Sequence, residues 1–196
     1  MVNIINDKSL VLGVMSGTSM DGLDISCARY YEQNNVWKFD LLEAETFEYQ
    51  SKIKLDFLKV FNKKYDLHKM DIKFGHLISD YIELFLKKYN RKIDLISSHG
   101  HTVFHNPKDG YTKQIGSGSL ISKRLGIPVV CNFRQQDIDF GGQGAPLVPI
   151  GDKLLFPQYD SCLNLGGIVN ISYNVNGNRL AYDICPCNMI LNYLSK

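Results

Sequence analysis

The sequence has no long hydrophobic run and no excess of either charge. No apolar stretch approaches the roughly 20 residues that a helix needs to cross a bilayer. Residues 1–10 carry Asn3, Asn6, Asp7 and Lys8, which breaks the continuous apolar core typical of a signal peptide. We therefore expect a cytoplasmic protein without a membrane partner. A formal net charge of +2 over 196 residues is too small to indicate binding to nucleic acid.

Cysteine is scarce, and its pattern does not suggest pairing. There are five cysteines, an odd number, scattered as Cys27, Cys131, Cys162, Cys185 and Cys187. Without a secretion signal, such a set argues against a disulfide framework. The close pair Cys185 and Cys187 has no second pair to match it, so it is a weak indication of a metal or redox site.

The composition and the apolar patterns predict a soluble α/β fold. Hydrophobic residues make up 44% and charged residues 21% of the chain, which is typical of globular domains. Short apolar runs predict a mixed five-stranded sheet from residues 9–15, 23–31, 36–46, 93–97 and 127–133. Amphipathic spacing predicts helices over residues 51–61, 70–89 and 117–125.

The pattern restarts near Pro157, which predicts a second unit. Strands over 162–165, 168–175 and 179–184 are interrupted by a glycine pair and by an Asn176-Gly177 hairpin turn, and a helix follows over 188–194. We expect domains at 1–157 and 158–196. Because one hairpin and one helix cannot bury a core of their own, the second domain is expected to be truncated and to lack a C-terminal half.

A loop of small and polar residues follows the first predicted strand. It comprises Ser16, Gly17, Thr18, Ser19, Met20, Asp21 and Gly22. Small residues let backbone N–H groups approach an anion, and hydroxyls add donors, so phosphate binding is one interpretation. The other is an ordinary polar hairpin turn, although closing a hairpin needs only two or three residues. The loop lacks the GxxxxGK[ST] pattern and is therefore not a Walker loop.

Two further segments are rich in glycine. Gly166 and Gly167 interrupt a predicted strand pair, and either a closely approaching ligand or a β-bulge explains them. The GGQGAP segment at 141–146 follows Arg134 and Asp137. Arg134 can grip a carboxylate or phosphate at two points, and Asp137 can accept hydrogen bonds from sugar hydroxyls. The alternative is a surface ion pair beside a flexible loop.

Two other candidates carry titratable side chains. His99, His101 and His105 have loose spacing for zinc, with no cysteine or acid beside them, so we favour structural or substrate-contacting histidines over metal ligands. Asp183 ends a predicted strand ahead of a proline and a helix. This position suits a general base, but aspartate before a helix is also a common N-cap, and the residues alone leave both interpretations open.

Taken together, these segments resemble the anhydro-N-acetylmuramic acid kinase family, within the wider actin-like and hexokinase-like fold group. The resemblance is carried by residues 13–22 (GVMSGTSMDG), 98–100 (SHG), 114–116 (QIG), 132–134 (NFR), 141–149 (GGQGAPLVP), 164–167 (NLGG) and 182–188 (YDICPCN). These strings run in the expected order from about residue 10 to residue 194. MSGTSMDG and GGQGAPLVP are highly specific to the family.

The resemblance implies an actin-like ATPase domain of the ribonuclease H-like kind, with a mixed sheet, followed by the opening of a second such domain. ATP and Mg²⁺ are the implied cofactors, with no protein side chain assigned to a metal. ATP phosphates would be held by the loop from Ser16 to Gly22, by Leu23, and by Gly166 and Gly167. The resemblance also implies a sugar pocket, for which we select His99, Thr102, Arg134 and Asp137.

The implied activity is an ATP-dependent kinase of murein recycling. Asp183 would activate a water to open 1,6-anhydro-N-acetylmuramic acid, and the freed 6-oxygen would accept the phosphoryl group, giving N-acetylmuramic acid 6-phosphate. A homodimer is expected of the full-length form. Three departures stand out: Tyr182 replaces phenylalanine, Cys185 and Cys187 replace glycines, and the chain has half the family's length. They leave open a non-catalytic sugar- or nucleotide-binding module, or an inactive truncated product.

Overall fold

The computed structural model describes residues 9–195. The expectation that the chain has no signal peptide rests mainly on residues 1–8, which lie outside the described residues. The strands are β1 Leu10–Ser16, β2 Gly22–Gln33, β3 Val36–Glu48, β4 Leu95–Asn106, β5 Tyr111–Ile115, β6 Val129–Val130, β7 Ser161–Leu165, β8 Ile168–Val175 and β9 Asn178–Pro186. The helices are α1 Ser51–Phe61, α2 Leu67–Tyr89, α3 Gly118–Leu125, α4 Phe133–Asp139, α5 Val148–Leu155 and α6 Asn188–Leu194, with a short 3₁₀ turn at Pro107–Asp109.

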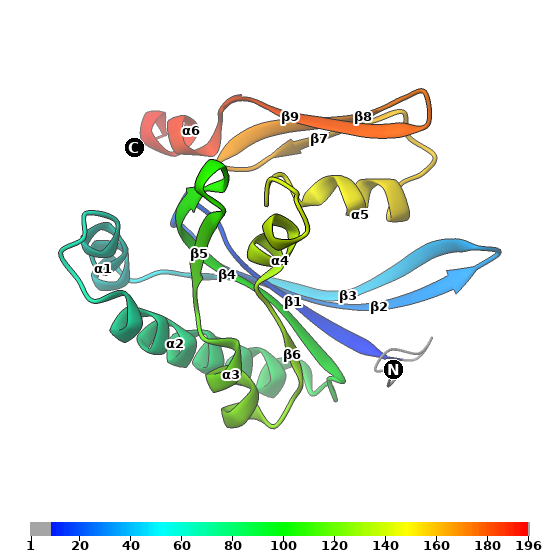
Figure 1. The fold of residues 1–196 in the computed structure, drawn as a ribbon. Coiled ribbons are helices and arrows are strands. Elements are labelled where there is room, and N and C mark those ends of the chain that lie inside the picture. Colours follow the sequence, from blue (N-terminus) through cyan, green and yellow to red (C-terminus); the bar gives the residue numbers. More distant parts are fainter. Residues whose placement is uncertain (1–8, 196) are drawn as a thin grey trace.

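The first sheet is mixed, as the sequence predicts. Its order is β3-β2-β1-β4-β5, and the short β6 pairs with β4 (Figure 1). The three opening strands form an antiparallel meander, whereas β1 runs parallel to β4. The expected count of five strands is wrong, because β5 makes a sixth. Its sequence, YTKQI, is short and largely polar, so it carries little strand signal.

Helices α1, α2 and α3 cover one face of this sheet and close the core (Figure 1). The stripe that predicted α2 is fully buried: Met70, Phe74, Ile78, Ile82 and Phe85 all have 0% exposure. Asp66 caps α2 by accepting a hydrogen bond from the Lys69 N–H, and Ser117 caps α3 in the same way through Leu120. The predictions of these three helices are confirmed to within three residues at each end.

The segment after α3 departs from expectation. Residues 127–133 were expected to form a strand, but only Val129–Val130 pairs with β4. Asn132 adopts a left-handed backbone with φ of 63°, which turns the chain directly into α4. The sequence carries little helix signal for α4 and α5, because they have only 7 and 8 residues and α5 contains Pro149 and Gly151.

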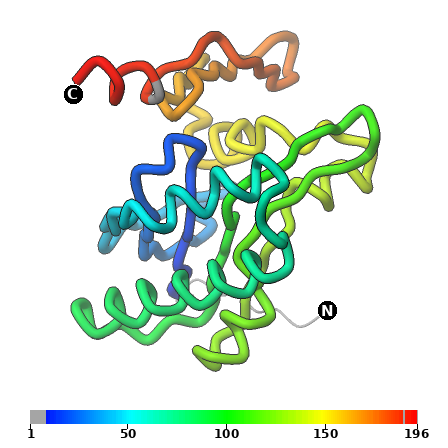
Figure 2. The backbone as a smooth tube through the Cα atoms, turned by 90° about the vertical axis from the view of Figure 1, so that its left-hand side faces the viewer, coloured from blue at the N-terminus to red at the C-terminus, as the bar shows by residue number. Residues whose placement is uncertain are grey.

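The second sheet has the order β7-β8-β9 and repeats the antiparallel meander of β1 to β3. The predicted turn at Asn176 and Gly177 is present, with positive φ at both residues, as a type I′ turn requires. Helix α5 lies between the two sheets and contacts both β3 and β9 (Figures 1 and 2). The expected domain limits at 157 and 158 stay a prediction.

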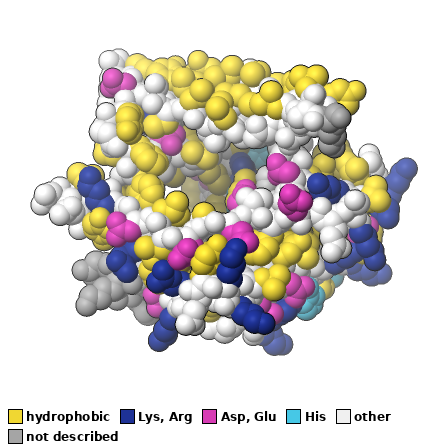
Figure 3. Space-filling model, turned by 180° about the vertical axis from the view of Figure 1, so that it is seen from behind, with side chains coloured by type: hydrophobic (Ala, Val, Ile, Leu, Met, Phe, Trp, Pro, Cys, Tyr) yellow, Lys and Arg dark blue, Asp and Glu magenta, His cyan; other side chains and the backbone are white. Residues whose placement is uncertain are grey.

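The two faces of this second sheet differ in character. The inner face carries Ser172, which donates a hydrogen bond to Asp152 of α5. The opposite, outer face carries Leu163, Leu165, Leu180 and Tyr182, each between 46% and 60% exposed. A space-filling view shows hydrophobic side chains gathered along this end of the molecule (Figure 3). The chain therefore presents an apolar surface that no residue between 9 and 195 covers.

We predict that the 196-residue chain self-associates through this outer face. Replacing both Leu163 and Leu180 by serine should weaken the self-association at least about tenfold, because burying one leucine contributes roughly 1.5–3 kcal/mol. Sedimentation velocity over a concentration series measures the change. The matched control is the double replacement of Leu55 and Leu58, which are also exposed but lie on α1. A monomeric parent, or an equal effect in the control, would contradict the prediction.

Candidate functional site

The loop expected to hold phosphates lies between β1 and β2. Its Asp21 carboxylate accepts hydrogen bonds from the Ser19 hydroxyl, at 2.8 Å, and from the Gly22 N–H, at 3.0 Å. Met20 has a left-handed φ of 52°, and its N–H bonds to the Gly17 carbonyl. No hydrogen bond in the described chain uses the hydroxyl or N–H of Thr18. These donors fit an anion such as a phosphate.

Ser16, expected to belong to this loop, lies beneath it in a buried chain of hydrogen bonds. The Tyr49 hydroxyl donates to the Ser16 hydroxyl at 2.8 Å, and the Ser16 hydroxyl lies 2.9 Å from Nδ1 of His101. The His101 ring stacks on Phe57, with ring centroids 4.1 Å apart. Ser16 is 2% exposed, so the structure uses its side chain to support the loop from below. No pattern in the sequence had indicated that Tyr49 takes part in this support of the loop.

His99 and Arg134 form the centre of a second cluster. Arg134 Nε donates to His99 Nε2 at 2.8 Å, and its Nη1 donates to the Gly144 carbonyl at 2.7 Å. His99 Nδ1 then bonds to the Gly100 carbonyl at 3.0 Å. Burial lowers the pKa of both His99 and Arg134, and the negative charge of Asp183 opposes that lowering for Arg134. The Asp183 carboxylate of the second sheet is therefore close enough to Arg134 for its charge to act on the guanidinium of the first unit.

A local irregularity in β4 places His99 in this cluster. The parallel register pairs Val14 with Ser98 and Met15 with Gly100, so His99 is an extra residue in β4. Gly100 has φ of +69°, and a side chain there would collide with the Ile115 carbonyl. Such bulges re-aim side chains beside functional sites. Only glycine satisfies both requirements at position 100.

Asp137 and Thr102 make contacts within the protein. Asp137 Oδ2 accepts a hydrogen bond from the Gly144 N–H at 2.7 Å, and a side chain at Gly142 would collide with the same carboxylate. The segment at 141–146 is therefore tied to α4 by Arg134 and Asp137, which is not the arrangement of a free linker beside a surface ion pair. Thr102 accepts a hydrogen bond from Gln114 Nε2 at 3.3 Å.

Asp183 lies on the inner face of the second sheet. The register places it in a row with Asn170 and Asn164, and Ile184 is an extra residue that makes a bulge in β9. The N-cap position of α6 is Cys187, so the interpretation of Asp183 as a helix cap is wrong. The position of Asp183 on the inner face keeps the general-base hypothesis open.

Gly166 and Gly167 form the turn between β7 and β8, and not a β-bulge. The N–H groups of Cys187 and Asn188 donate to the carbonyls of Gly167 and Gly166, at 2.9 and 3.1 Å. The turn is therefore anchored to the start of α6. Within residues 9–195, no hydrogen bond joins it to the loop at Gly17–Asp21.

The three histidines are engaged in separate contacts. His99 bonds to Arg134, His101 to Ser16, and His105 Nδ1 lies 3.1 Å from the Thr112 hydroxyl. In the part of the chain that the structure describes, no cluster of three or more histidine, cysteine or acidic side chains could hold a metal ion. The five cysteines are all free thiols, which confirms the expectation of no disulfide framework.

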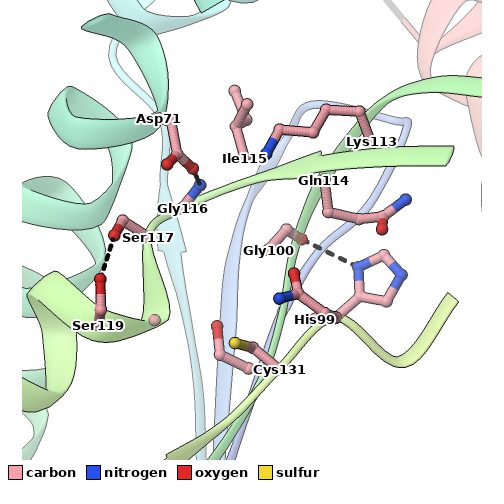
Figure 4. Close-up of a pocket in the computed structure, with 13 residues that line it drawn as sticks. Asp71, His99, Gly100, Lys113, Gln114, Ile115, Gly116, Ser117, Ser119 and Cys131 are labelled. Atoms are coloured by element: carbon pink, nitrogen blue, oxygen red, sulfur yellow. Dashed lines mark hydrogen bonds between the residues drawn. The ribbon is translucent and has the colours of Figure 1, made fainter. Parts of the chain in front are cut away.

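A cavity of about 250 Å³ opens beside His99 and was not anticipated from the sequence (Figure 4). Its walls come from α2, β4, β5, the N-terminus of α3 and the segment before α4. The lining includes Asp71, Ser98, Lys113, Ser119 and Cys131. Residues of the SHG, QIG and NFR strings line this cavity, whereas Asp71 lies on helix α2 and belongs to no motif that the sequence had indicated.

The parallel pairing of β1 with β4 inside a mixed sheet, followed by a second meander, is consistent with the ribonuclease H-like fold of actin-like ATPases. The comparison of sequences is more specific. Residues 9–195 match the sequence model described as anhydro-N-acetylmuramic acid kinase. The chain therefore belongs to the anhydro-N-acetylmuramic acid kinase family.

Individual relatives agree with this assignment. An anhydro-N-acetylmuramic acid kinase of Pasteurella multocida (strain Pm70) is 37% identical, over 92% of this chain and 50% of the relative. Those of Vibrio cholerae serotype O1 and Pelagibacter ubique are each 35% identical, over 94% and 92% of this chain and 52% of each relative. The chain thus spans about half the length of the curated relatives that it matches.

We predict a pH-dependent stability that originates in His101. Burial lowers the pKa of His101 to about 4. Between this value and the unfolded pKa of about 6.5, the unfolded chain binds a proton that the folded chain does not. The free energy of unfolding should therefore fall by about 3 kcal/mol as the pH drops from 7 to 4.

Urea unfolding at several pH values measures this dependence. His101→Gln should remove the His101 component, so that the variant loses less stability than the parent between pH 7 and pH 4. The control is His76→Gln, at an exposed position of α2. This control should keep the parent's pH dependence. Parallel curves for the parent and His101→Gln would show that the buried chain of hydrogen bonds does not depend on a neutral His101.

Proposed function

We propose that this chain provides the phosphate loop, the sugar-contacting wall and the general base of an ATP-dependent carbohydrate kinase. The proposed reaction opens 1,6-anhydro-N-acetylmuramic acid with water and phosphorylates it to N-acetylmuramic acid 6-phosphate in murein recycling. The single observation that carries the proposal is the position of Asp183 on the inner face of β9, where its charge acts on Arg134, which in turn bonds to His99. Membership of a family named for this kinase activity supports the choice of substrate.

Asp183 is well placed to act on a water molecule. It lies in β9, on the sheet face turned toward the first unit, and it is exposed to solvent. In the proposed step Asp183 accepts a proton from water, and the water oxygen forms a bond to the anomeric carbon as the bond from that carbon to O6 breaks. A carboxylate in this position can act as the general base of the step.

The loop at Gly17–Asp21 is the proposed site for the phosphates of ATP. Its unused donors at Thr18, together with the backbone around Gly17, fit phosphate oxygens. Gly22 and Leu23 continue the loop into β2, and the Gly166–Gly167 turn is the proposed second contact with ATP. When bound, ATP with Mg²⁺ supplies the phosphoryl group and neutralises charge during its transfer. The residues of this chain bind and orient the phosphates.

His99, Thr102, Arg134 and Asp137 are the proposed wall of the sugar site. Arg134 and Asp137 act by holding the 141–146 segment, as their contacts with Gly144 indicate. Arg134 also fixes the tautomer of His99, because its Nε donates to Nε2 and leaves the proton on Nδ1. These residues therefore position the wall of the site, and their remaining donors and acceptors face the sugar.

Partners and location complete the proposal. The relatives are about twice as long as this chain, so a C-terminal half is the proposed partner that covers the outer face of the second sheet. We propose a homodimer for the full-length form and a cytoplasmic location, which suits a protein with five free thiols. Among residues 9–195, no helix is long and apolar enough to span a membrane.

A second candidate function is a non-catalytic sugar- or nucleotide-binding module. It is favoured by the exposed Cys185, two residues from Asp183, where the family resemblance has glycine. A thiol side chain beside the proposed base changes the space left for the sugar or a phosphate. Turnover by the full-length protein distinguishes the kinase from this module.

We predict that Asp183→Asn in the full-length protein that carries this chain lowers turnover of the anhydro sugar by at least ~10²-fold. Asparagine is nearly isosteric but cannot accept the proton, and general-base catalysis typically contributes ~10²–10⁴-fold. Nucleotide affinity should change little, because the proposed phosphate contacts lie elsewhere. Steady-state kinetics and calorimetric titration with ATP measure the two quantities.

The matched control is Asp160→Asn, an exposed carboxylate just before β7 in the same unit. It should keep the parent's turnover. If Asp183→Asn turns over within a few-fold of the parent, Asp183 is not the base. If the full-length parent binds the sugar and ATP without turnover, the binding-module function replaces the kinase.

A further inference from the structure

The cavity beside His99 contains a buried hydroxyl that no protein group satisfies. Ser98 is 1% exposed, lines the cavity, and its Oγ has no hydrogen-bond partner in the described part of the chain. Buried polar groups are almost always hydrogen-bonded, and leaving one unpaired is costly. The hydroxyl therefore indicates a partner that enters the cavity from outside the protein.

The other donors around the cavity favour an anionic partner. The N-terminus of α3 opens onto it, with Gly118 and Ser119 in the first turn, where backbone N–H groups have no intrahelical partner. Lys113 also lines the cavity and forms no ion pair within residues 9–195. A hydroxyl, a helix N-terminus and an ammonium group together match the acceptors of a carboxylate.

Asp71 is the one carboxylate in the lining, and one of its oxygens is engaged in a contact within the protein. Its Oδ1 accepts a hydrogen bond from the Gly116 N–H at 2.8 Å, which holds the side chain beside the end of β5 (Figure 4). The space is also small. About 250 Å³ is several times the roughly 30 Å³ of one water molecule, which leaves room for a short acidic side arm.

The cavity adjoins the proposed sugar site. His99 lines it and accepts a hydrogen bond from Arg134. A larger cavity of about 600 Å³ shares four of its lining residues: Lys113, Gln114, Cys131 and Asn132. Because His99 lines the smaller cavity, a sugar ring bound against His99 can extend a substituent toward Ser98.

We propose that the Ser98 cavity is a subsite for the carboxylate of the lactyl ether that distinguishes muramic acid from glucosamine. The inference rests on the proposed function, since it concerns the same sugar. It assigns to Ser98, Lys113 and the α3 N-terminus the selection of an acidic sugar over its neutral counterpart. A charged group bound by these donors strengthens binding without taking part in bond cleavage.

The test compares two sugars that differ only in this side arm, 1,6-anhydro-N-acetylmuramic acid and 1,6-anhydro-N-acetylglucosamine. Binding of each is measured by calorimetry and turnover by steady-state kinetics, with the full-length protein that carries this chain. The parent should prefer the acidic sugar. Ser98→Ala should weaken binding of the acidic sugar by about ten- to a hundredfold, the effect of one hydrogen bond to a charged group, and leave the neutral sugar unchanged.

The matched control is Ser79→Ala, another buried serine, whose hydroxyl is already bonded to the Gly75 carbonyl. It should destabilise the fold without changing the preference between sugars, whereas Ser98→Ala should not destabilise the free protein. Lys113→Met should reduce the preference in the same direction as Ser98→Ala. Lys123→Met, on the exposed side of α3, should not.

The outcomes separate the subsite from the proposed function. Carboxylate-dependent binding that Ser98→Ala removes, without turnover, would support the subsite and overturn the kinase activity. Turnover with equal preference for both sugars, or an equal loss for both sugars in Ser98→Ala, would overturn the subsite and leave the kinase intact. A parent that binds neither sugar would overturn both.

Discussion

The parallel pairing of β1 with β4 is the constraint on which the rest of the structure depends. These two strands lie at the centre of the first sheet, and Leu12 and Ile96, which the register pairs, are both completely buried. The pairing brings the end of β1 beside the middle of β4, although some 80 residues separate them. Burial of this apolar pair thus fixes the place where the loop at Gly17–Asp21 begins.

Polar contacts at the end of this strand pair position the side chains of the candidate site. Ser16 at the end of β1 meets His101 of β4, and Tyr49 joins them from the start of the segment leading to α1. His99 precedes Gly100 in β4, and the bulge at this point turns the His99 side chain toward Arg134. Two histidines of one strand therefore serve different purposes: one is buried support beneath a loop, and the other belongs to the wall of the proposed sugar site.

Side chains along each strand of the second sheet alternate between its two faces, and this alternation contributes to the candidate site. The period of two along β9 places Tyr182 on the apolar outer face and Asp183 on the inner face. The same alternation explains why the outer face is exposed while Ser172 is buried against α5. The register of β9 therefore has two consequences. It leaves the outer face of the second sheet uncovered, and it places the Asp183 carboxylate on the side of the first unit.

Local sequence by itself determined the elements with strong periodicity: the three helices over the first sheet, the two meanders and the Asn176-Gly177 turn, because burial and turn geometry act over a few residues. It also indicated the glycine-containing loops, because such a composition is uncommon outside turns and ligand-binding loops. Only the tertiary structure decided that Ser16 is buried, that Asp183 is not a helix cap, that α4 replaces a strand after Asn132, and that Ser98 lacks a partner. Each of these depends on contacts between residues far apart in the chain, for which no local pattern exists.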